Sequence, residues 1–186
     1  MSEAATARPD GKRKAATPRS SKDSVIDVRH LVKVYGGRGQ EEIKAVNDVS
    51  FSVGEGEFFG FLGPNGAGKT TVIRIITTLL AKTSGSVSVA GLDVEKDGAE
   101  IRRIIGYTGQ SIGVDGELTG RENLWLIGRL YHMPNSLVDE RVEELLEVLQ
   151  LKESADRRAY TYSGGMRRRL DLGAGLVHHP RILFLD

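Results

Sequence analysis

The sequence contains no cysteine among its 186 residues, so disulfide bonds and thiolate metal sites are excluded. It contains no run of eighteen apolar residues, so it predicts no membrane-spanning helix. The N-terminus lacks the apolar segment of a secretory signal. We therefore expect a protein that stays in the cytosol and meets a membrane only through a partner protein.

Charge is unevenly spread along a chain whose formal net charge is +1. Residues 1–24 hold six of the 26 basic and three of the 25 acidic residues, with almost no large apolar side chains, which predicts a disordered basic tail. This tail either touches anionic lipid or is a solvated arm, and the second interpretation is favoured. Residues 25–186 suit one domain and are near neutral, so no nucleic-acid partner is expected.

One stretch fits a phosphate-binding pattern. Residues 63–70 match G-x-x-x-x-G-K-[ST] at every defined position. The apolar run 58–62 before it predicts a buried strand, and residues 71–80 after it predict a mostly apolar helix. Strand, glycine loop and helix are the context that this motif requires. The residues assigned to nucleotide contact here are Gly63, Pro64, Asn65, Gly66, Ala67, Gly68, Lys69, Thr70 and Thr71.

The composition of this loop suits a triphosphate. Glycines lack Cβ, so the backbone can curl and point its N–H groups at phosphate oxygens, and the following helix adds its positive dipole end. Lys69 would reach the β- and γ-phosphates, and Thr70 would offer its hydroxyl to Mg²⁺. The alternative is a glycine-rich turn with an incidental Lys-Thr, which the strand–helix setting disfavours.

The residues around the loop predict a mixed sheet. Alternating apolar residues predict short strands over 25–35, 46–53 and 86–90, part of a partly antiparallel sheet. A helix is expected over 98–103 and a strand over 104–108.

From Ser111 onward the pattern predicts helices. Thr119-Gly-Arg-Glu122 is a capping box, and Asn135 and Ser136 offer caps for a helix over 137–151. Trp125 is either a packing residue or an exposed contact point. The apolar stripe expected on the second helix is Val138, Val142, Leu145, Leu146 and Leu149.

A third helix is expected from Arg167 to about His178. Ser163 is its predicted N-cap, and the two glycines after Ser163 expose N–H groups that make either a second anion site or a plain cap. The arginines 167–169 are interpreted as a solvated basic face. His178 and His179 are interpreted as residues that complement the helix dipole, not as metal ligands.

Three further residues are candidates for the nucleotide site. Tyr35 is either a stacking face for adenine or an ordinary tyrosine at a strand end. Gln110, at the end of a strand, either contacts a metal-bound water and a phosphate or is an ordinary loop residue. Asp186 follows the apolar strand 182–185, and in P-loop NTPases such a carboxylate holds Mg²⁺. The candidate catalytic residues are Lys69, Gln110 and Asp186, and the candidate metal ligands are Thr70, Gln110 and Asp186.

Taken together, these motifs resemble the ATP-binding domain of ABC transporters over residues 25–186. The A-loop aromatic falls on Tyr35, the Q-loop glutamine on Gln110 and Walker B on residues 182–186. The signature, usually L-S-G-G-Q, is here Tyr162-Ser-Gly-Gly-Met166. The resemblance implies an α/β P-loop NTPase core with an antiparallel β subdomain and an α-helical subdomain. It also favours the nucleotide-site roles of Tyr35 and Gln110 over the ordinary ones.

Finer details resemble the daunorubicin/doxorubicin-resistance ATP-binding proteins within that family. They lie in residues 107–110, 118–124, 127–131 and 162–172. This resemblance implies a subunit that binds and hydrolyses Mg-ATP and drives export of drugs or other hydrophobic compounds through a separate membrane permease, at the cytoplasmic side of the membrane. It also implies a head-to-tail dimer with a second nucleotide-binding subunit, in which each ATP meets the partner's signature residues: Ser163, Gly164 and Gly165.

Family members continue past Walker B with a catalytic glutamate and a switch histidine, whereas Asp186 is the last residue here. The expectation is a fragment that lacks the C-terminal part of the core and binds Mg-ATP better than it hydrolyses it. Its expected division is core and β subdomain over 25–110, helical subdomain over 111–178 and Walker B strand over 179–186. Two alternatives are a soluble ABC ATPase acting on ribosomes or DNA, and a non-catalytic ATP-binding fragment.

Overall fold

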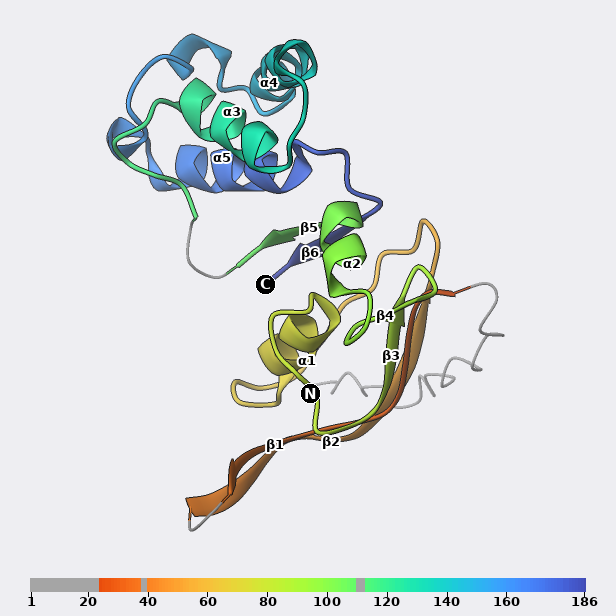
Figure 1. Cartoon of the computed structure of the whole chain (residues 1–186). Coiled ribbons are helices and arrows are strands. Elements are labelled where there is room, and N and C mark those ends of the chain that lie inside the picture. Colours follow the sequence, from red (N-terminus) through yellow and green to blue (C-terminus); the bar gives the residue numbers. More distant parts are fainter. Residues whose placement is uncertain (1–23, 38–39, 110–112) are drawn as a thin grey trace, which may run out of the picture.

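The computed structural model describes residues 24–37, 40–109 and 113–186 (Figure 1). The predicted tail, except Ser24, and Gln110 lie outside the described residues. The strands are β1 (Ser24–Gly37), β2 (Gln40–Gly54), β3 (Ser84–Val89), β4 (Leu92–Asp93), β5 (Ile105–Thr108) and β6 (Ile182–Leu185). The helices are α1 (Lys69–Ile76), α2 (Gly98–Ile104), α3 (Gly120–Leu130), α4 (Asn135–Val148) and α5 (Gly164–Leu176), with short 3₁₀ turns η1 (Lys152–Ser154) and η2 (Ala159–Thr161).

Two sheets organise the described residues. β2, β1, β3 and β4 form an antiparallel sheet in that order, and β5 pairs with β6 in parallel. Figure 1 shows α1 and α2 between these two sheets, with α3, α4 and α5 gathered at the far end of the molecule. The expected mixture of an α/β core, an antiparallel sheet and a helical region is confirmed.

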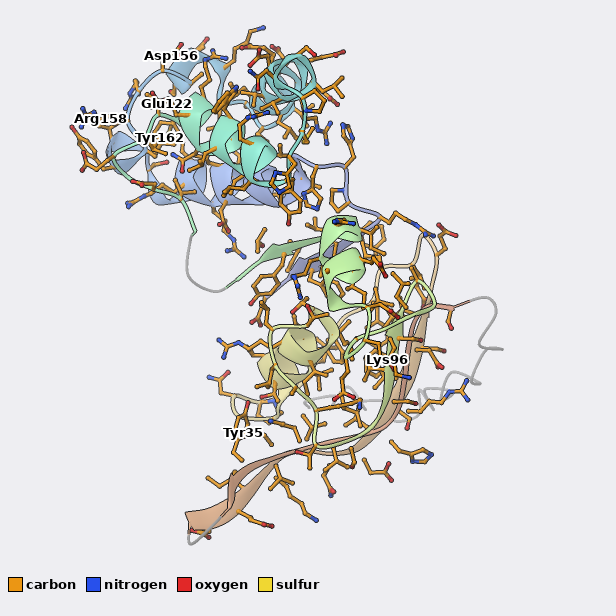
Figure 2. All side chains as sticks on the ribbon, in the orientation of Figure 1. Tyr35, Lys96, Glu122, Asp156, Arg158 and Tyr162 are labelled. Atoms are coloured by element: carbon orange, nitrogen blue, oxygen red, sulfur yellow. The ribbon has the colours of Figure 1, made fainter. Side chains whose placement is uncertain are left out.

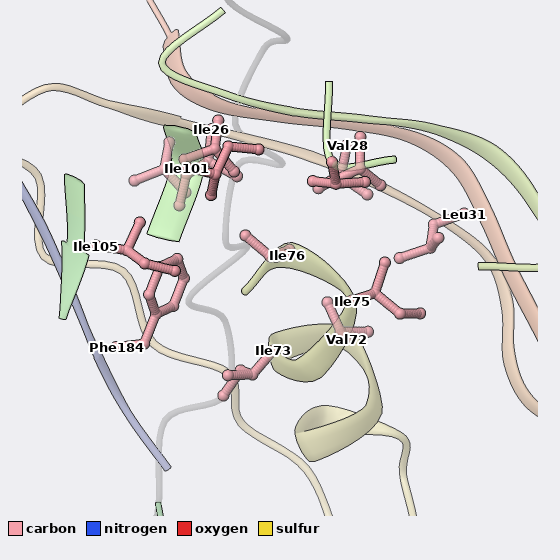
Figure 3. Close-up of a cluster of buried hydrophobic side chains, with 14 of the residues drawn as sticks. Ile26, Val28, Leu31, Val72, Ile73, Ile75, Ile76, Ile101, Ile105 and Phe184 are labelled. Carbon is pink, nitrogen blue, oxygen red and sulfur yellow. The ribbon is translucent and has the colours of Figure 1, made fainter. Parts of the chain in front are cut away.

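Helix α1 joins the two sheets through its apolar face. Ile75 and Ile76 are 0% and 1% exposed, and they belong to one buried cluster with Val28 of β1 and Phe184 of β6 (Figure 3). Residues two apart on a strand share a face, which is why the apolar residues of β1 reach this core together. Because α1 is fixed in this way, the loop that precedes it lies close to the end of β6.

Helix α1 ends four residues earlier than the predicted range 71–80. The Thr78 backbone has a φ of 63°, the Leu79 N–H donates to the Arg74 carbonyl over 2.8 Å, and the Thr78 N–H donates to the Ile75 carbonyl over 3.1 Å. This is the hydrogen-bond pattern of a Schellman motif, which satisfies the last carbonyls of a helix. The apolar composition continues past this point, so composition alone extended the prediction too far.

The apolar run before the phosphate loop is not the buried strand that was predicted. Phe58 is fully exposed and Leu62 is 87% exposed. Phe59 and Phe61, in contrast, each pack on Phe51 with ring centroids 5.1 Å apart, and their own rings lie 5.2 Å from each other. A buried strand needs hydrogen-bonded neighbours on its edges, and none of the described strands pairs with this run. Only one face of the segment is therefore covered.

The helical region matches its predicted pattern closely. The capping box is confirmed, because Thr119 and Glu122 exchange both side-chain-to-backbone bonds. The predicted caps of the next helix are wrong: α4 begins at Asn135 with Pro134 as its N-cap, and no side-chain cap bond forms. The fixed φ of proline sets the start there, so Asn135 and Ser136 lie inside the helix. All five residues of the predicted stripe are buried.

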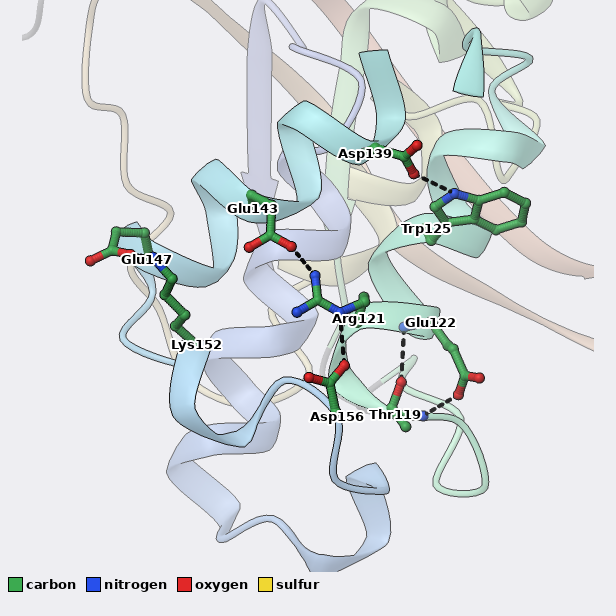
Figure 4. Close-up of polar contacts among 9 residues, drawn as sticks. All are labelled: Thr119, Arg121, Glu122, Trp125, Asp139, Glu143, Glu147, Lys152 and Asp156. Carbon is green, nitrogen blue, oxygen red and sulfur yellow. Dashed lines mark hydrogen bonds and ion pairs between the residues drawn. The ribbon is translucent and has the colours of Figure 1, made fainter. Parts of the chain in front are cut away.

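Polar contacts connect α3 to its neighbours (Figure 4). Arg121 pairs with Glu143 of α4 and with Asp156, and the Trp125 indole N–H donates to Asp139 over 3.0 Å. Trp125 is 38% exposed, so it is a partly covered contact between α3 and α4. Among the described helices, none combines the length and apolar character that a membrane crossing requires.

Candidate functional site

The phosphate loop requires glycine for two separate reasons. Gly66 and Gly68 have φ angles of 81° and 83°, in the left-handed region that other residues rarely adopt. In addition, a Cβ on Gly68 would lie 2.3 Å from the carbonyl oxygen of Ala45 in β2. The loop is thus curled on itself and pressed against β2, directly before α1 begins at Lys69.

The Lys69 ammonium lies inside this curl. Its Nζ donates to the carbonyl oxygens of Gly63 and Pro64, over 2.8 and 2.7 Å. These two bonds hold a positive charge at the centre of the loop, beside the N-terminus of α1. Backbone N–H groups at a helix start and a fixed ammonium together favour an anion.

Asp186 meets the loop from the end of β6. Its Oδ1 accepts a bond of 3.0 Å from the Thr70 hydroxyl, and its Oδ2 lies 3.5 Å from the Tyr107 hydroxyl of β5. Its backbone N–H donates to the Thr108 carbonyl over 3.0 Å, which extends the β5–β6 pairing. Burial, followed by the charge of Asp186, raises the pKa of Tyr107, so this hydroxyl stays protonated and can donate.

A cavity of about 450 Å³ opens over the loop. A hydroxyl and a carboxylate in contact are hard oxygen ligands of the kind that Mg²⁺ takes, with phosphate and water oxygens filling the other positions. The residues present therefore fit a phosphate-bound Mg²⁺. The cavity is lined by Ala45, Asn65, Gly66, Ala67, Gly68, Lys69, Thr70, Thr71 and Asp186.

Tyr35 lies on β1 in the same hairpin as the Ala45 that contacts the loop. Its cross-strand partner is Ile43, and the two side chains are 41% and 64% exposed. The Lys33 ammonium lies 5.0 Å from the centre of the Tyr35 ring. An exposed aromatic face beside an exposed aliphatic one can receive a planar base, and the adenine-stacking role of Tyr35 stays a prediction.

The predicted second anion site lies elsewhere in the molecule. Ser163 caps α5, with its Oγ accepting from the Met166 N–H over 3.3 Å. Figure 2 shows Tyr162, the residue before Ser163, at the opposite end of the molecule from Tyr35. A single chain therefore does not bring the Ser163 region to the cavity over the phosphate loop.

The prediction for one of the three arginines is wrong. Arg168 is not merely solvated, because its guanidinium donates to the Gly109 carbonyl over 2.8 Å and to Asp171 over 3.3 Å. Asp171, which the sequence analysis did not consider, also accepts from the Gly113 N–H over 2.9 Å. The available signal was the i,i+3 spacing of Arg168 and Asp171, which places the two opposite charges on one face of the helix.

The prediction for His178 is also wrong. Its ring stacks on Tyr131 with centroids 3.7 Å apart, and Nε2 lies 2.8 Å from the Ile105 carbonyl. Burial lowers the pKa of His178, so the ring packs as a neutral imidazole and not as a cation at a helix end. The C-terminus of α5 is thereby attached to β5.

Comparison with known proteins points to one family. A family model described as "ABC transporter" matches residues 46–186. The doxorubicin resistance ATP-binding protein DrrA of Mycobacterium tuberculosis is 47% identical over 164 residues, which cover 88% of this chain and 49% of that protein. The daunorubicin/doxorubicin resistance ATP-binding protein DrrA of Streptomyces peucetius is 45% identical over 161 residues, which cover 87% of this chain and 47% of that protein. The chain spans about half the length of these curated relatives.

Solved structures agree with this assignment. A dimeric, post-hydrolysis state of the ATP-binding cassette MJ0796 bound to ADP and Pi has a TM-score of 0.77 and 29% identity to this chain. The match covers 87% of this chain and 73% of that one. With a family model over most of its length and this fold, the chain belongs to the ABC transporter family.

Proposed function

We propose that this chain is part of an ATP-binding subunit that binds Mg-ATP and, by hydrolysing it, drives export of drugs or other hydrophobic compounds. One observation carries the proposal. The ammonium of Lys69 lies within the glycine loop while Thr70 bonds to Asp186, so a phosphate-binding and a cation-binding group share one cavity.

The candidate nucleotide-site residues have separate tasks in this proposal. Lys69 and the loop N–H groups neutralise and orient the phosphates, and Tyr35 stacks on the adenine. Thr70 and Asp186 supply oxygen ligands for Mg²⁺, which when bound screens the charge on the phosphates. Gln110 is proposed as a further ligand near the metal.

The glycines at the start of α5 support a site shared between two subunits. A Cβ on Gly164 or Gly165 would meet no atom within 4 Å, so packing within the chain does not require glycine there. Glycine in a helix costs up to about 1 kcal/mol relative to alanine. A glycine that packing within the chain does not require leaves room for a ligand to approach the backbone closely. We therefore propose that Ser163, Gly164 and Gly165 bind the γ-phosphate held by a second subunit in a head-to-tail dimer.

The remaining parts of the proposal rest on the relatives. The printed names of the two DrrA proteins assign them to doxorubicin or daunorubicin resistance. By this likeness, the partner would be a separate membrane permease, the place would be the cytoplasmic face of the membrane, and no nucleic acid would be involved. The proposed division keeps a core and β subdomain over 25–110, a helical subdomain over 111–178 and a Walker B strand over 179–186.

The first prediction concerns the lysine of the loop. Lys69→Ala removes the side-chain charge that is bonded to the loop carbonyls of Gly63 and Pro64, so ATP affinity should fall by a factor of roughly ten or more, as expected when a charge-assisted contact is lost. The measurement is a titration with a fluorescent ATP analogue, followed by polarisation. Lys96→Ala is the matched control, because Lys96 follows β4 and does not line the cavity (Figure 2).

An unchanged affinity in Lys69→Ala, with Lys96→Ala also unchanged, would show that the loop does not bind the nucleotide. Equal losses in both variants would indicate general destabilisation, which a thermal melt of each protein would reveal.

A further inference from the structure

Two side chains of α5 contact the first part of the segment that connects β5 to α3, at Gly109 and at Gly113. Arg168 donates to the Gly109 carbonyl at the start of that segment, over 2.8 Å. Asp171 accepts from the Gly113 N–H, four residues further along the segment, over 2.9 Å. The two side chains are themselves bonded over 3.3 Å. One turn of α5 therefore fixes the separation of Gly109 and Gly113.

Asp171 is the buried member of this pair. The Asp171 side chain is 7% exposed, whereas that of Arg168 is 45% exposed. A buried carboxylate is costly unless charged and N–H partners satisfy it, and Asp171 has one of each. The adjacent arginines, Arg167 and Arg169, show no side-chain hydrogen bond or ion pair to any residue that the structure describes. The contact is thus specific to Arg168.

The same polar chain reaches the phosphate loop. Thr70 donates to Asp186, the Asp186 N–H donates to the Thr108 carbonyl, and the next residue of the chain, Gly109, accepts from Arg168. The carboxylates of Asp171 and Asp186 also line one cavity of about 780 Å³ together with Tyr107. Three hydrogen bonds and the peptide bond between Thr108 and Gly109 therefore connect the loop that would hold Mg-ATP to the helix that begins after Ser163.

Close packing makes α5 and β5 move together. A Cβ on Gly106 of β5 would lie 2.1 Å from the carbonyl oxygen of Gly175 in α5. At the end of α5, His178 bonds to the Ile105 carbonyl over 2.8 Å. Backbones this close do not slide past one another without breaking contacts, because packed interfaces are not continuously deformable.

We propose that Arg168 and Asp171 are positioning residues that couple nucleotide binding at the phosphate loop to the position of α5 and the helical region. The inference rests on the proposed function, because the signal that it transmits is the binding of Mg-ATP at the cavity lined by Lys69 and Asp186. A change at Asp186 passes through Thr108 and Gly109 to Arg168, and so to the helix that carries the signature residues.

The chain contains its own probe for this coupling. Trp125 is the single tryptophan, and it lies on α3 in the helical region, hydrogen-bonded to Asp139 of α4. Its emission reports changes in that region, whereas polarisation of a fluorescent ATP analogue reports binding at the loop. We expect saturating Mg-ATP to change the Trp125 emission of the wild-type protein and to slow amide exchange in α5.

The decisive variants are Arg168→Ala and Asp171→Asn. Each should reduce the Trp125 response by more than about half, while ATP affinity stays within about threefold of wild type, because positioning residues do not touch the nucleotide. The double variant should lose no more than the stronger single variant, because both changes break one link. Arg168→Lys keeps a donor and should recover part of the response. Arg167→Ala and Arg169→Ala are matched controls on the same helix and should respond fully.

Three results would overturn the inference. One is a full Trp125 response in Arg168→Ala, another is an equal loss in Arg169→Ala, and the third is a wild-type protein that binds Mg-ATP without any change in Trp125 emission or α5 exchange. If Asp171→Asn does not fold, the exposed Arg168 decides the question alone. Failure of the proposed function is seen separately, because Lys69→Ala would then leave ATP affinity unchanged.

Discussion

At the scale of single residues, Tyr162 shows how a departure from the usual signature is accommodated. Where the family pattern has leucine, this chain has a tyrosine that is 3% exposed and donates from its hydroxyl to the Ser154 carbonyl over 2.6 Å. The hydroxyl also occupies the space beside Gly120, where a Cβ would lie 2.2 Å from it. Burial raises the pKa of Tyr162, so the phenol stays neutral and acts as a donor.

The bond to Ser154 leads to a stability prediction. Tyr162→Phe removes one of the two hydrogen bonds to the Ser154 carbonyl, which also accepts from the Arg157 N–H over 3.0 Å, so the free energy of unfolding should fall by about 0.5–1.5 kcal/mol. Denaturant unfolding followed by circular dichroism measures this change. Tyr160→Phe is the matched control, since Tyr160 is 59% exposed, and it should alter stability by less than about 0.5 kcal/mol. Equal effects in the two variants would contradict this role for the hydroxyl.

At the scale of elements, α5 contains glycines of two different kinds. Gly173 and Gly175 lie where the helix meets its neighbours, and a Cβ there would come within 2.6 Å of Leu149 and 3.1 Å of Thr108. Gly164, in the first turn, would place a Cβ in open space. The first kind is required by packing within the chain, whereas the second kind has no such reason.

This contrast predicts that two glycine-to-alanine changes shift the free energy of unfolding in opposite directions. Gly106→Ala, on the strand that faces Gly175, should lower the unfolding free energy by about 2 kcal/mol or more, because backbone atoms must move apart. Gly164→Ala should raise it by up to about 1 kcal/mol, because alanine is the better helix former. Gly164→Ala should nevertheless weaken ATP-dependent dimerisation, measured by analytical ultracentrifugation with Mg-ATP. Dimerisation as strong as in the wild type would argue against the shared site.

At the scale of the whole molecule, two buried clusters are joined through α5 and β5. One cluster contains Ile75 and Phe184 of the core, and the other contains Leu146 and Leu170 of the helical region. His178 lies at the junction, stacked on Tyr131 from α3's end and bonded to the Ile105 carbonyl. Its Nδ1 is buried without a hydrogen-bond partner among the described residues.

The junction makes stability depend on pH. The pKa of His178 is lowered in the folded state, first by burial and further by the nearby His179. At mildly acidic pH the unfolded chain therefore binds a proton at His178 more readily than the folded chain does. The contribution of the neutral His178 ring to folding stability is fully present above the ordinary histidine pKa of about 6.5, and it is lost as the pH falls below that value. Unfolding free energy should therefore decrease between about pH 7.5 and pH 5.5, by less than the limit of about 1.4 kcal/mol per pH unit for one proton.

Denaturant titrations at several pH values test this dependence. His178→Gln should flatten the slope, because the variant lacks the buried imidazole whose pKa is lowered on folding. The control is His132→Asn, an exposed position with a φ of 58° that asparagine tolerates. A slope unchanged in His178→Gln would place the pH dependence elsewhere.

The sequence by itself determined the features that depend on near neighbours in the chain. The phosphate loop, the Thr119–Glu122 capping box and the buried stripe of α4 each follow from residues within one or two turns of one another, so local spacing was enough to predict them. Family resemblance added the order of motifs, from Tyr35 to Asp186, and comparison then confirmed the family.

Only the tertiary structure decided how distant residues are held together. Thr70 and Asp186 are 116 positions apart; the motifs placed both of them at one metal site, but the direct bond between them depends on α1 packing against β6. The contacts of Arg168 with Gly109 and of Asp171 with Gly113, and the exposure of Phe58, likewise depend on which elements lie side by side. Local patterns carry propensity and amphipathic faces, whereas long-range contacts are set by packing, and the coupling proposed here lies in those contacts.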